Sequence, residues 1–171
     1  MGLLLRAELP SKKIVLEFGV YKGYSLNYFA KKLPHSIIYG FDSFLGLEQN
    51  WYVNTAKRGT LSLSGKPPKK LFDNVELVIG SFKNTIPDFS MKNPQLQIDL
   101  LHIDCDTYSA TKLVLASFAD NLRPGSIVIF DEFFGYPNWQ FHESKAFSEY
   151  VTEHKVDYKV IGFSNNQIAI K

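Results

Sequence analysis

Residues 15–23 read VLEFGVYKG, and this stretch decides the fold expected of the chain. The run Ile14–Phe18 is rich in β-branched and aromatic residues, which is the composition of a buried strand. Glycines at positions 19 and 23 follow it, and apolar residues then recur at helical spacing until Pro34. The sequence therefore predicts a strand, a tight glycine turn and a helix over Tyr24–Leu33.

The glycine turn predicts a nucleotide or nucleoside ligand, because the backbone there can be approached closely and the helix start offers unpaired N–H groups. Its spacing is Gly-x-x-x-Gly, whereas a dinucleotide pyrophosphate favours Gly-x-Gly-x-x-Gly. Glu17, at the end of the strand, would repel phosphates but suits a cationic group, directly or through water. S-adenosylmethionine has an ammonium, a sulfonium and no phosphate, so it fits this turn better than NAD.

Length and composition bound the class of protein. The 171 residues predict one domain over residues 1–171, large enough to bury about two-thirds of its unfolded surface. The net charge is +2 with both signs interspersed, which argues against nucleic acid or an anionic membrane as a partner. The single cysteine, Cys105, favours a reducing compartment. The opening residues are too short for a signal peptide and no apolar run approaches about 18 residues, so we expect a cytoplasmic protein.

Strands and helices are expected to alternate along the rest of the chain. Helical spacing of apolar residues predicts helices over Thr107–Asn121 and around residues 146–151, and Leu3–Leu9 resembles the end of a helix. Further strands are expected at Ser36–Phe41, Val75–Ile79, Leu100–Ile103 and Ile127–Phe130, with a terminal hairpin of Tyr158–Phe163 and Gln167–Ile170. This order predicts an α/β fold whose mostly parallel sheet ends in an antiparallel edge.

Residues 45–70 differ from the rest, being polar, rich in turn residues and without helical or strand periodicity. A loop this long inside a compact domain is usually functional, so we interpret it as a lid with Trp51 and Tyr52 as its hydrophobic anchor. A solvated, disordered insertion is the alternative.

Carboxylates follow every predicted parallel strand except the third. Ligands of such sheets bind beyond the carboxyl ends of the strands, so these side chains are expected at one edge. Their mutual repulsion calls for a compensating cation, and hard oxygen ligands suit Mg²⁺ or Ca²⁺, whereas no set of histidines and cysteines suits zinc. As an alternative, each acid could cap a helix, as Asp106 could before Thr107. The six acids are Glu17, Asp42, Asp104, Asp106, Asp131 and Glu132.

Several motifs together resemble the macrocin O-methyltransferase family, which belongs to the class I S-adenosylmethionine-dependent methyltransferases. They are the glycine stretch extended to Ser25, GFDSFLGL at 40–47 with Trp51, GSF at 80–82, HIDCDTY at 102–108 and PGSIVIFDEF at 124–133. The resemblance runs from about Ile14 to the C-terminus. It implies a Rossmann-like fold with a mostly parallel seven-stranded sheet, helices on both faces and a C-terminal antiparallel hairpin. It also implies methyl transfer to a hydroxyl, often on a natural-product sugar, with a divalent metal that is usually Mg²⁺.

The resemblance also assigns roles to residues. The methionine part of the cofactor is expected near the glycine turn, the ribose hydroxyls at Asp42 and the adenine at Ser81 and Phe82. The full set expected to contact the cofactor is Glu17, Gly19, Tyr21, Gly23, Ser25, Asp42, Ser43, Gly80, Ser81, Phe82 and Asp104. The metal positions match Asp104, Asp131 and Glu132, and Glu132 stands where an aspartate is commoner. Asp106 matches a proposed catalytic base.

The chemistry requires a base because a neutral alcohol is a poor nucleophile, and a bound metal lowers its pKa. Asp106 is the first candidate for the base, and a role as a metal ligand is the alternative. His142 is a second candidate for base or substrate contact, with a structural or surface role as the alternative. We expect His102 to be packed within its strand. The aromatic residues Phe133, Phe134, Tyr136 and Trp139 are expected either to wall the acceptor pocket or to pack within their loop.

The sequence thus predicts an O-methyltransferase acting on a small-molecule hydroxyl, such as that of a sugar or glycoside. A metal-independent methyltransferase and an inactive cofactor-binding homologue are the alternatives. The helical N-terminal extension of the resembling family is nearly absent, so we hypothesise that another subunit of a homo-oligomer covers the pocket.

Overall fold

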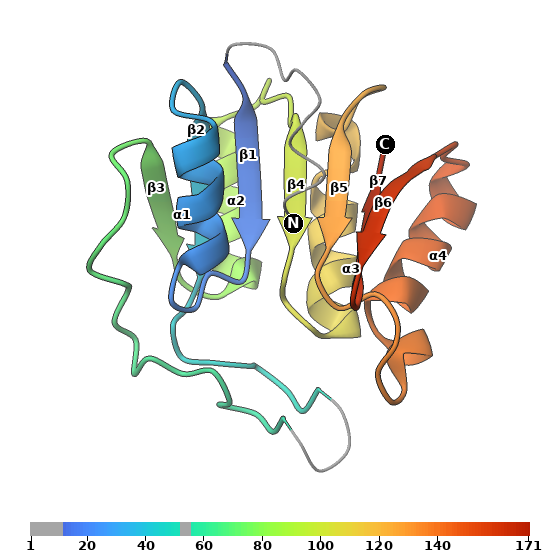
Figure 1. The fold of residues 1–171 in the computed structure, drawn as a ribbon, viewed down its shortest axis with the longest axis horizontal. Helices are drawn as coiled ribbons and strands as arrows, with labels where there is room; N and C mark the ends of the chain where they lie inside the picture. Colours follow the sequence, from blue (N-terminus) through green and yellow to red (C-terminus); the bar gives the residue numbers. More distant parts are fainter. Residues whose placement is uncertain (1–11, 52–55) are drawn as a thin grey trace.

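A seven-stranded sheet forms the centre of the protein, seen in a computed structural model that describes residues 12–51 and 56–171 (Figure 1). The strand order is β3-β2-β1-β4-β5-β7-β6. The first five strands in this order, β3, β2, β1, β4 and β5, pair in parallel with their neighbours. Strand β7 runs antiparallel to both of its neighbours, β5 and β6. The strands are β1 (Ile14–Phe18), β2 (Ile37–Asp42), β3 (Val75–Ile79), β4 (Leu100–Ile103), β5 (Ile127–Phe130), β6 (Val160–Ser164) and β7 (Gln167–Ile170).

Helices lie on both faces of this sheet (Figure 1). One face carries α1 (Tyr24–Lys32), and the other carries α2 (Phe82–Lys92), α3 (Tyr108–Ser117) and α4 (Glu143–His154). Two 3₁₀ helices, η2 (Ala119–Asn121) and η3 (Trp139–Phe141), follow α3 and precede α4. The expected α/β fold with an antiparallel C-terminal hairpin is therefore confirmed.

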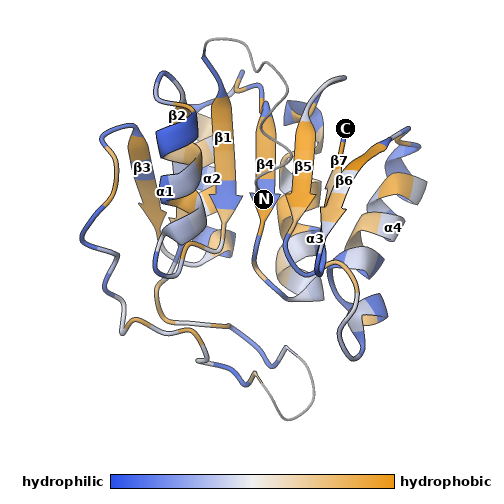
Figure 2. Ribbon diagram, in the orientation of Figure 1, coloured by the Kyte–Doolittle hydropathy of each residue, from blue (hydrophilic) through white to orange (hydrophobic). Residues whose placement is uncertain are grey.

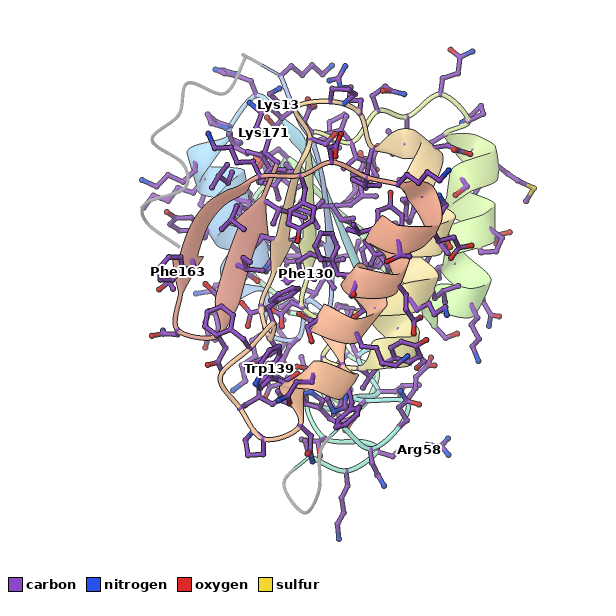
Figure 3. The ribbon with its side chains drawn as sticks, turned by 90° about the vertical axis from the view of Figure 1, so that its right-hand side faces the viewer. Lys13, Arg58, Phe130, Trp139, Phe163 and Lys171 are labelled. Atoms are coloured by element: carbon purple, nitrogen blue, oxygen red, sulfur yellow. The ribbon has the colours of Figure 1, made fainter. Side chains whose placement is uncertain are left out.

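Each face of the sheet has its own apolar core. Leu26 of α1 is fully buried on one side. On the other side the ring of Phe18 stacks on Phe41, with centroids 4.3 Å apart, and Phe130 packs against Phe147 of α4 at 5.1 Å (Figure 3). The strands are hydrophobic along most of their length, and hydrophilic residues lie mainly in the loops at both ends of the sheet (Figure 2).

Most of the predicted elements are found, with small differences at their ends. The third, fourth and fifth strands and the last strand have the predicted bounds, while β6 begins at Val160 and α3 ends at Ser117. Helix α2 was missed, because Pro87 inside it obscures a pattern in which Ile86 and Phe89 are buried. The predicted helical segment Leu3–Leu9 lies outside the described residues. Within them, no helix is both long and apolar enough to cross a membrane.

Backbone hydrogen bonds join several parts of the connection from β2 to β3, residues 43–74, which we call the strap. The backbone N–H of Leu47 donates to the carbonyl of Thr60, and Leu63 donates to Phe44. Asn27 of α1 anchors its far end, donating to the carbonyl of Lys70 at 2.9 Å. These bonds argue against a disordered insertion for the described part, and a lid role stays a prediction.

Asp99, just before β4, fastens the end of the sheet opposite to the ligand loops. It accepts hydrogen bonds from the ammonium of Lys13, the backbone N–H of Ile14 and the guanidinium of Arg123, at 2.8 to 2.9 Å. Although burial raises the pKa of Asp99, these donors outweigh it and hold the pKa below its usual range. The ionised carboxylate therefore stabilises the folded state above the ordinary carboxyl pKa, and this stabilisation is lost as the pH falls through the depressed pKa.

We expect Asp99→Asn to lower the free energy of unfolding at pH 7 by about 2 kcal/mol, since hydrogen bonds to a buried charge are lost. Arg123→Gln, which changes a half-exposed partner, should cost about 1 kcal/mol or less. Urea unfolding at pH 7 and at pH 3 measures both variants. The gap in stability between the wild type and Asp99→Asn should be smaller at pH 3 than at pH 7, and an equal gap at both values would contradict this role.

Candidate active site

The glycine turn after β1 is held by the carboxylate of Asp42, from the end of β2. One oxygen accepts the backbone N–H groups of Val20 and Tyr21, at 2.8 and 2.7 Å, and the other accepts that of Phe44 at 2.7 Å. Gly19 has φ +96°, and a Cβ there would lie 1.7 Å from the carbonyl oxygen of Asp104. The turn therefore needs glycine for both its conformation and its close contact with β4.

A cavity of about 400 Å³ opens beside this turn, beyond the carboxyl ends of β1, β2 and β4. Eight of the eleven predicted cofactor residues line it, namely Gly19, Tyr21, Asp42, Ser43, Gly80, Ser81, Phe82 and Asp104. The other three, Glu17, Gly23 and Ser25, are not among its lining residues. Their contact with the cofactor stays a prediction.

The strap forms a second wall of the cavity that the sequence did not specify residue by residue. The lining residues from the strap include Leu47, Glu48, Gln49 and Leu61. The side-chain amide of Gln49 donates to the hydroxyl of Ser109 on α3, 2.7 Å away. The strap thus reaches from the end of β2 to α3, the helix that follows β4. Leu47 ends the GFDSFLGL motif, whereas the only sequence signal for Glu48, Gln49 and Leu61 was their place in the long loop.

Glu17 is fully buried next to the cavity and contacts two side chains. Its Oε1 accepts the hydroxyl of Ser25 at 3.0 Å, and its Oε2 lies 3.0 Å from Nδ1 of His102. The β1–β4 register places Glu17 directly beside His102. His102 is packed in its strand as expected. It also lies between the carboxylates of Glu17 and Asp131, a contact that the sequence did not predict.

The other nitrogen of His102 faces the predicted metal site. Its Nε2 lies 3.8 Å from Oδ1 of Asp131, and one ligand atom from each of His102, Asp104 and Asp131 lies within 4.8 Å of the others. Glu132, the third predicted metal residue, is outside this group, and its carboxylate accepts the amide of Asn166 at 3.0 Å. Among the described residues, these three could hold a divalent cation, and the contribution of a histidine to this group was not expected from the sequence.

The charges of this group shift one another's pKa values. Burial, and then the charge of Asp131, raise the pKa of Asp104 well above its usual range. For Asp131, burial is outweighed by the contact with His102, and its pKa is lowered. For His102, burial lowers the pKa, but Asp131 and Glu17 raise it to about 10. Without a cation, the ring is therefore positively charged at neutral pH and offsets part of the acidic cluster.

Asp106 lies in the cavity wall two residues beyond Asp104. It is 6% exposed and has φ +61°. Burial, followed by the charges of Glu132 and Asp131, raises its pKa to about 7. The helix-cap alternative for Asp106 is wrong, because Thr107 is the N-cap residue of α3 and no side chain caps that end. A buried carboxyl with this pKa in a cavity can take up a proton at neutral pH.

His142, the second candidate base, lies outside the cavity lining. Its ring lies against Tyr136, with centroids 6.2 Å apart, and Tyr136 in turn contacts Trp51 of the strap at 5.4 Å. Burial lowers the pKa of His142. The ring is therefore neutral at pH 7, and a contact with the acceptor stays a prediction.

The other residues around the site have mainly structural surroundings. Phe133 packs against Phe130 and Phe147 in the core, as its loop-packing alternative predicts. Cys105 is buried with its thiol 3.6 Å from the hydroxyl of Thr111, and burial raises its pKa, which argues against a nucleophile. Glu143, to which no sequence pattern pointed, is fully buried and accepts the backbone N–H of Glu132 at 3.1 Å.

This strand order, with a glycine turn after β1 and an acid at the end of β2, defines a Rossmann-like class I methyltransferase fold. The chain matches the family described as "Methyltransferase domain" over residues 16–133, more than half of its length, and it belongs to that family. With the solved structures below, this identifies an S-adenosylmethionine-dependent methyltransferase.

Solved structures of similar fold include natural-product methyltransferases. The calicheamicin methyltransferase CalS11 is 26% identical, with a TM-score of 0.76, over 93% of this chain and 72% of that one. The O-methyltransferase NovP is 18% identical, with a TM-score of 0.69, over 92% and 70% of the two chains, and shows the fold alone. The methyltransferase MycE of the mycinamycin pathway, solved with Mg and SAH, also shows the fold alone. It is 13% identical, with a TM-score of 0.55, over 94% of this chain and 45% of that one. No curated protein compared with this chain matches it.

Proposed function

We propose that this methyltransferase transfers a methyl group from S-adenosylmethionine to a hydroxyl of a small molecule, a sugar or glycoside, with the help of a divalent cation. One observation carries the proposal: Asp104 both lines the cofactor cavity and belongs to the group of possible cation ligands. An acceptor held beside that group would lie next to the sulfonium methyl, as an in-line displacement requires. The similarity to CalS11, whose structure is also described as a TDP-rhamnose 3′-O-methyltransferase, supports a sugar acceptor.

The chain's own residues supply most of the mechanism. The turn held by Asp42 would position the cofactor, and the strap would exclude water above it. Asp106 would take the proton of the acceptor hydroxyl, because it is the buried carboxyl of the cavity with a pKa of about 7. A divalent cation at Asp104 and Asp131 would lower the pKa of that hydroxyl and fix its direction.

Two observations bear on the cation. The buried Nε2 of His102, which has no hydrogen-bond partner among the described residues, and the oxygens of Asp104 and Asp131 fit a divalent cation. A metal-independent reaction is the second candidate, since a charged His102 already offsets part of the acidic charge.

Isothermal titration calorimetry tests the proposal and separates it from the alternatives. We expect S-adenosylmethionine to bind without metal, and its binding to tighten when Mg²⁺ and a nucleoside-diphosphate sugar are both present. Methyl transfer from labelled donor to the sugar should stop with EDTA and return with Mg²⁺. Transfer that ignores EDTA would support the metal-independent reaction, and failure to bind the donor would contradict the whole proposal.

The finer expectations from the sequence belong to the same proposal. We infer membership of the macrocin O-methyltransferase group, a cytoplasmic location, and a small-molecule acceptor rather than nucleic acid or membrane. A homo-oligomer is proposed as the means of covering the pocket. Light scattering of the purified protein would measure its mass in solution, and a monomer that turns over normally would contradict that last point.

A further inference from the structure

His102 is held in one orientation between the two halves of the site. It lies on β4, and its side chain is fully buried. Its Nδ1 lies 3.0 Å from the carboxylate of Glu17, and its ring packs at 5.3 Å against Phe29 of α1. A carboxylate accepts hydrogen bonds, so Nδ1 carries the hydrogen of this contact. The ring is thereby fixed with Nε2 pointing toward Asp131.

The Nε2 atom is buried without a hydrogen-bond partner among the described residues. Its nearest acid, Asp131, lies 3.8 Å away, which is beyond hydrogen-bond distance. A buried polar atom left unpaired costs about 1 to 3 kcal/mol, so such atoms usually have a partner that completes them. A cation between Nε2, Asp104 and Asp131 is such a partner, because their ligand atoms lie within 4.8 Å of one another.

Glu132 is placed differently from Asp131, although the two residues are adjacent. Both residues follow the last residue of β5, and only Asp131 places a carboxylate oxygen in the group with His102 and Asp104. Glu132 accepts the amide of Asn166, and its backbone N–H donates to Glu143. Asp131 also accepts a side-chain amide, that of Gln167, so its place beside His102, rather than a lack of partners, distinguishes it from Glu132.

We infer that His102 is the third protein ligand of the divalent cation, through Nε2, in place of Glu132. Glu17 then acts as the supporting carboxylate that fixes the imidazole, as such partners commonly do for metal-bound histidines. The proton on Nε2 would be released when the cation binds. The inference rests on the cation of the proposed function and makes its ligands more specific. One nitrogen and two carboxylates favour a first-row transition metal over Mg²⁺ or Ca²⁺.

Mn²⁺ is the probe, because it is paramagnetic and accepts both oxygen and nitrogen ligands. Electron spin echo modulation of Mn²⁺ bound to the full chain should show a directly coordinated ¹⁴N. The signal should change to that of ¹⁵N in protein labelled at histidine. His102→Gln should abolish it and weaken Mn²⁺ binding about tenfold or more, whereas Glu132→Gln should keep the signal and bind within about threefold of the wild type.

The outcomes separate this inference from the proposed function. Bound Mn²⁺ without nitrogen modulation in the wild type overturns the histidine ligand but leaves metal-assisted methyl transfer standing. If Glu132→Gln weakens Mn²⁺ binding and His102→Gln does not, the histidine ligand is likewise overturned and metal-assisted methyl transfer still stands. No Mn²⁺ binding at all overturns both the ligand and the metal, and calorimetry with S-adenosylmethionine then tests the methyltransferase function by itself. The wild-type spectrum decides the question even if His102→Gln does not fold.

Discussion

Replacing Gly19 with alanine is expected to abolish S-adenosylmethionine binding and to destabilise the protein by about 2 to 5 kcal/mol. The new Cβ would lie 1.7 Å from the carbonyl oxygen of Asp104 and 2.7 Å from its carbonyl carbon. Both are backbone atoms, so no side-chain rotation relieves the clash, and overpacking of this kind costs about 1 to 3 kcal/mol. The φ of +96° adds about 1 to 2 kcal/mol of strain for any L-residue with a side chain.

Gly59→Ala is the matched control. Gly59 has a similar φ of +84°, but a Cβ there would meet no atom within 4 Å. It should therefore show the backbone strain alone, about 1 to 2 kcal/mol, and bind the cofactor normally. Urea unfolding and calorimetry measure both variants. Equal effects of the two substitutions would show that contact with Asp104 is not what requires glycine at position 19.

The close contact of Gly19 with the backbone of Asp104 also explains why the loss of cofactor binding in Gly19→Ala should be large. Moving the backbone of Asp104 would displace a carboxylate that lines the cavity and faces the possible cation. One substitution at the turn after β1 would therefore disturb both halves of the site. Metal binding by Gly19→Ala, followed with Mn²⁺, should fall together with cofactor binding.

The sequence predicted the strands well because buried β-branched runs bounded by turn residues leave few alternatives. It also predicted that acids gather at one edge, because parallel strands end on the same side. It could not supply the pairing of residues distant in the chain. The contact of Glu17 with His102 depends on the register of two strands 85 positions apart, and nothing in either local pattern encodes that register.

The same limit explains the other differences. Alternation along a strand showed that His102 and Ile103 point apart, but not which neighbours His102 would meet. Adjacent acids looked equivalent as ligands, although the chain after β5 turns only Asp131 toward His102. The hydrogen bond from Gln49 to Ser109 joins the strap to helix α3 and has no sequence signature. These contacts arise from packing of distant segments rather than from local preference.

Asp106→Asn is expected to lower kcat by about 10²- to 10⁴-fold, the usual contribution of a general base. The KM for S-adenosylmethionine should change far less, because the cofactor is held by the turn and Asp42. Asparagine is a suitable probe of the base, since it has the same shape and tolerates the φ of +61° found at this position. The fold should therefore be preserved, as circular dichroism can check.

The pH dependence of the reaction distinguishes a base from a residue that only shapes the pocket. A base must be ionised, so the wild-type rate should fall as the pH drops through the pKa of Asp106, about 7 without a cation. A bound divalent cation favours the ionised form, so in the Mg²⁺-dependent reaction this fall should lie below pH 7. In Asp106→Asn the residual rate should no longer show this fall, the acidic limb of the pH profile. His142→Gln, the test of the rival base, should keep the limb and lower kcat by less than about tenfold, and the opposite pattern would transfer the role to His142.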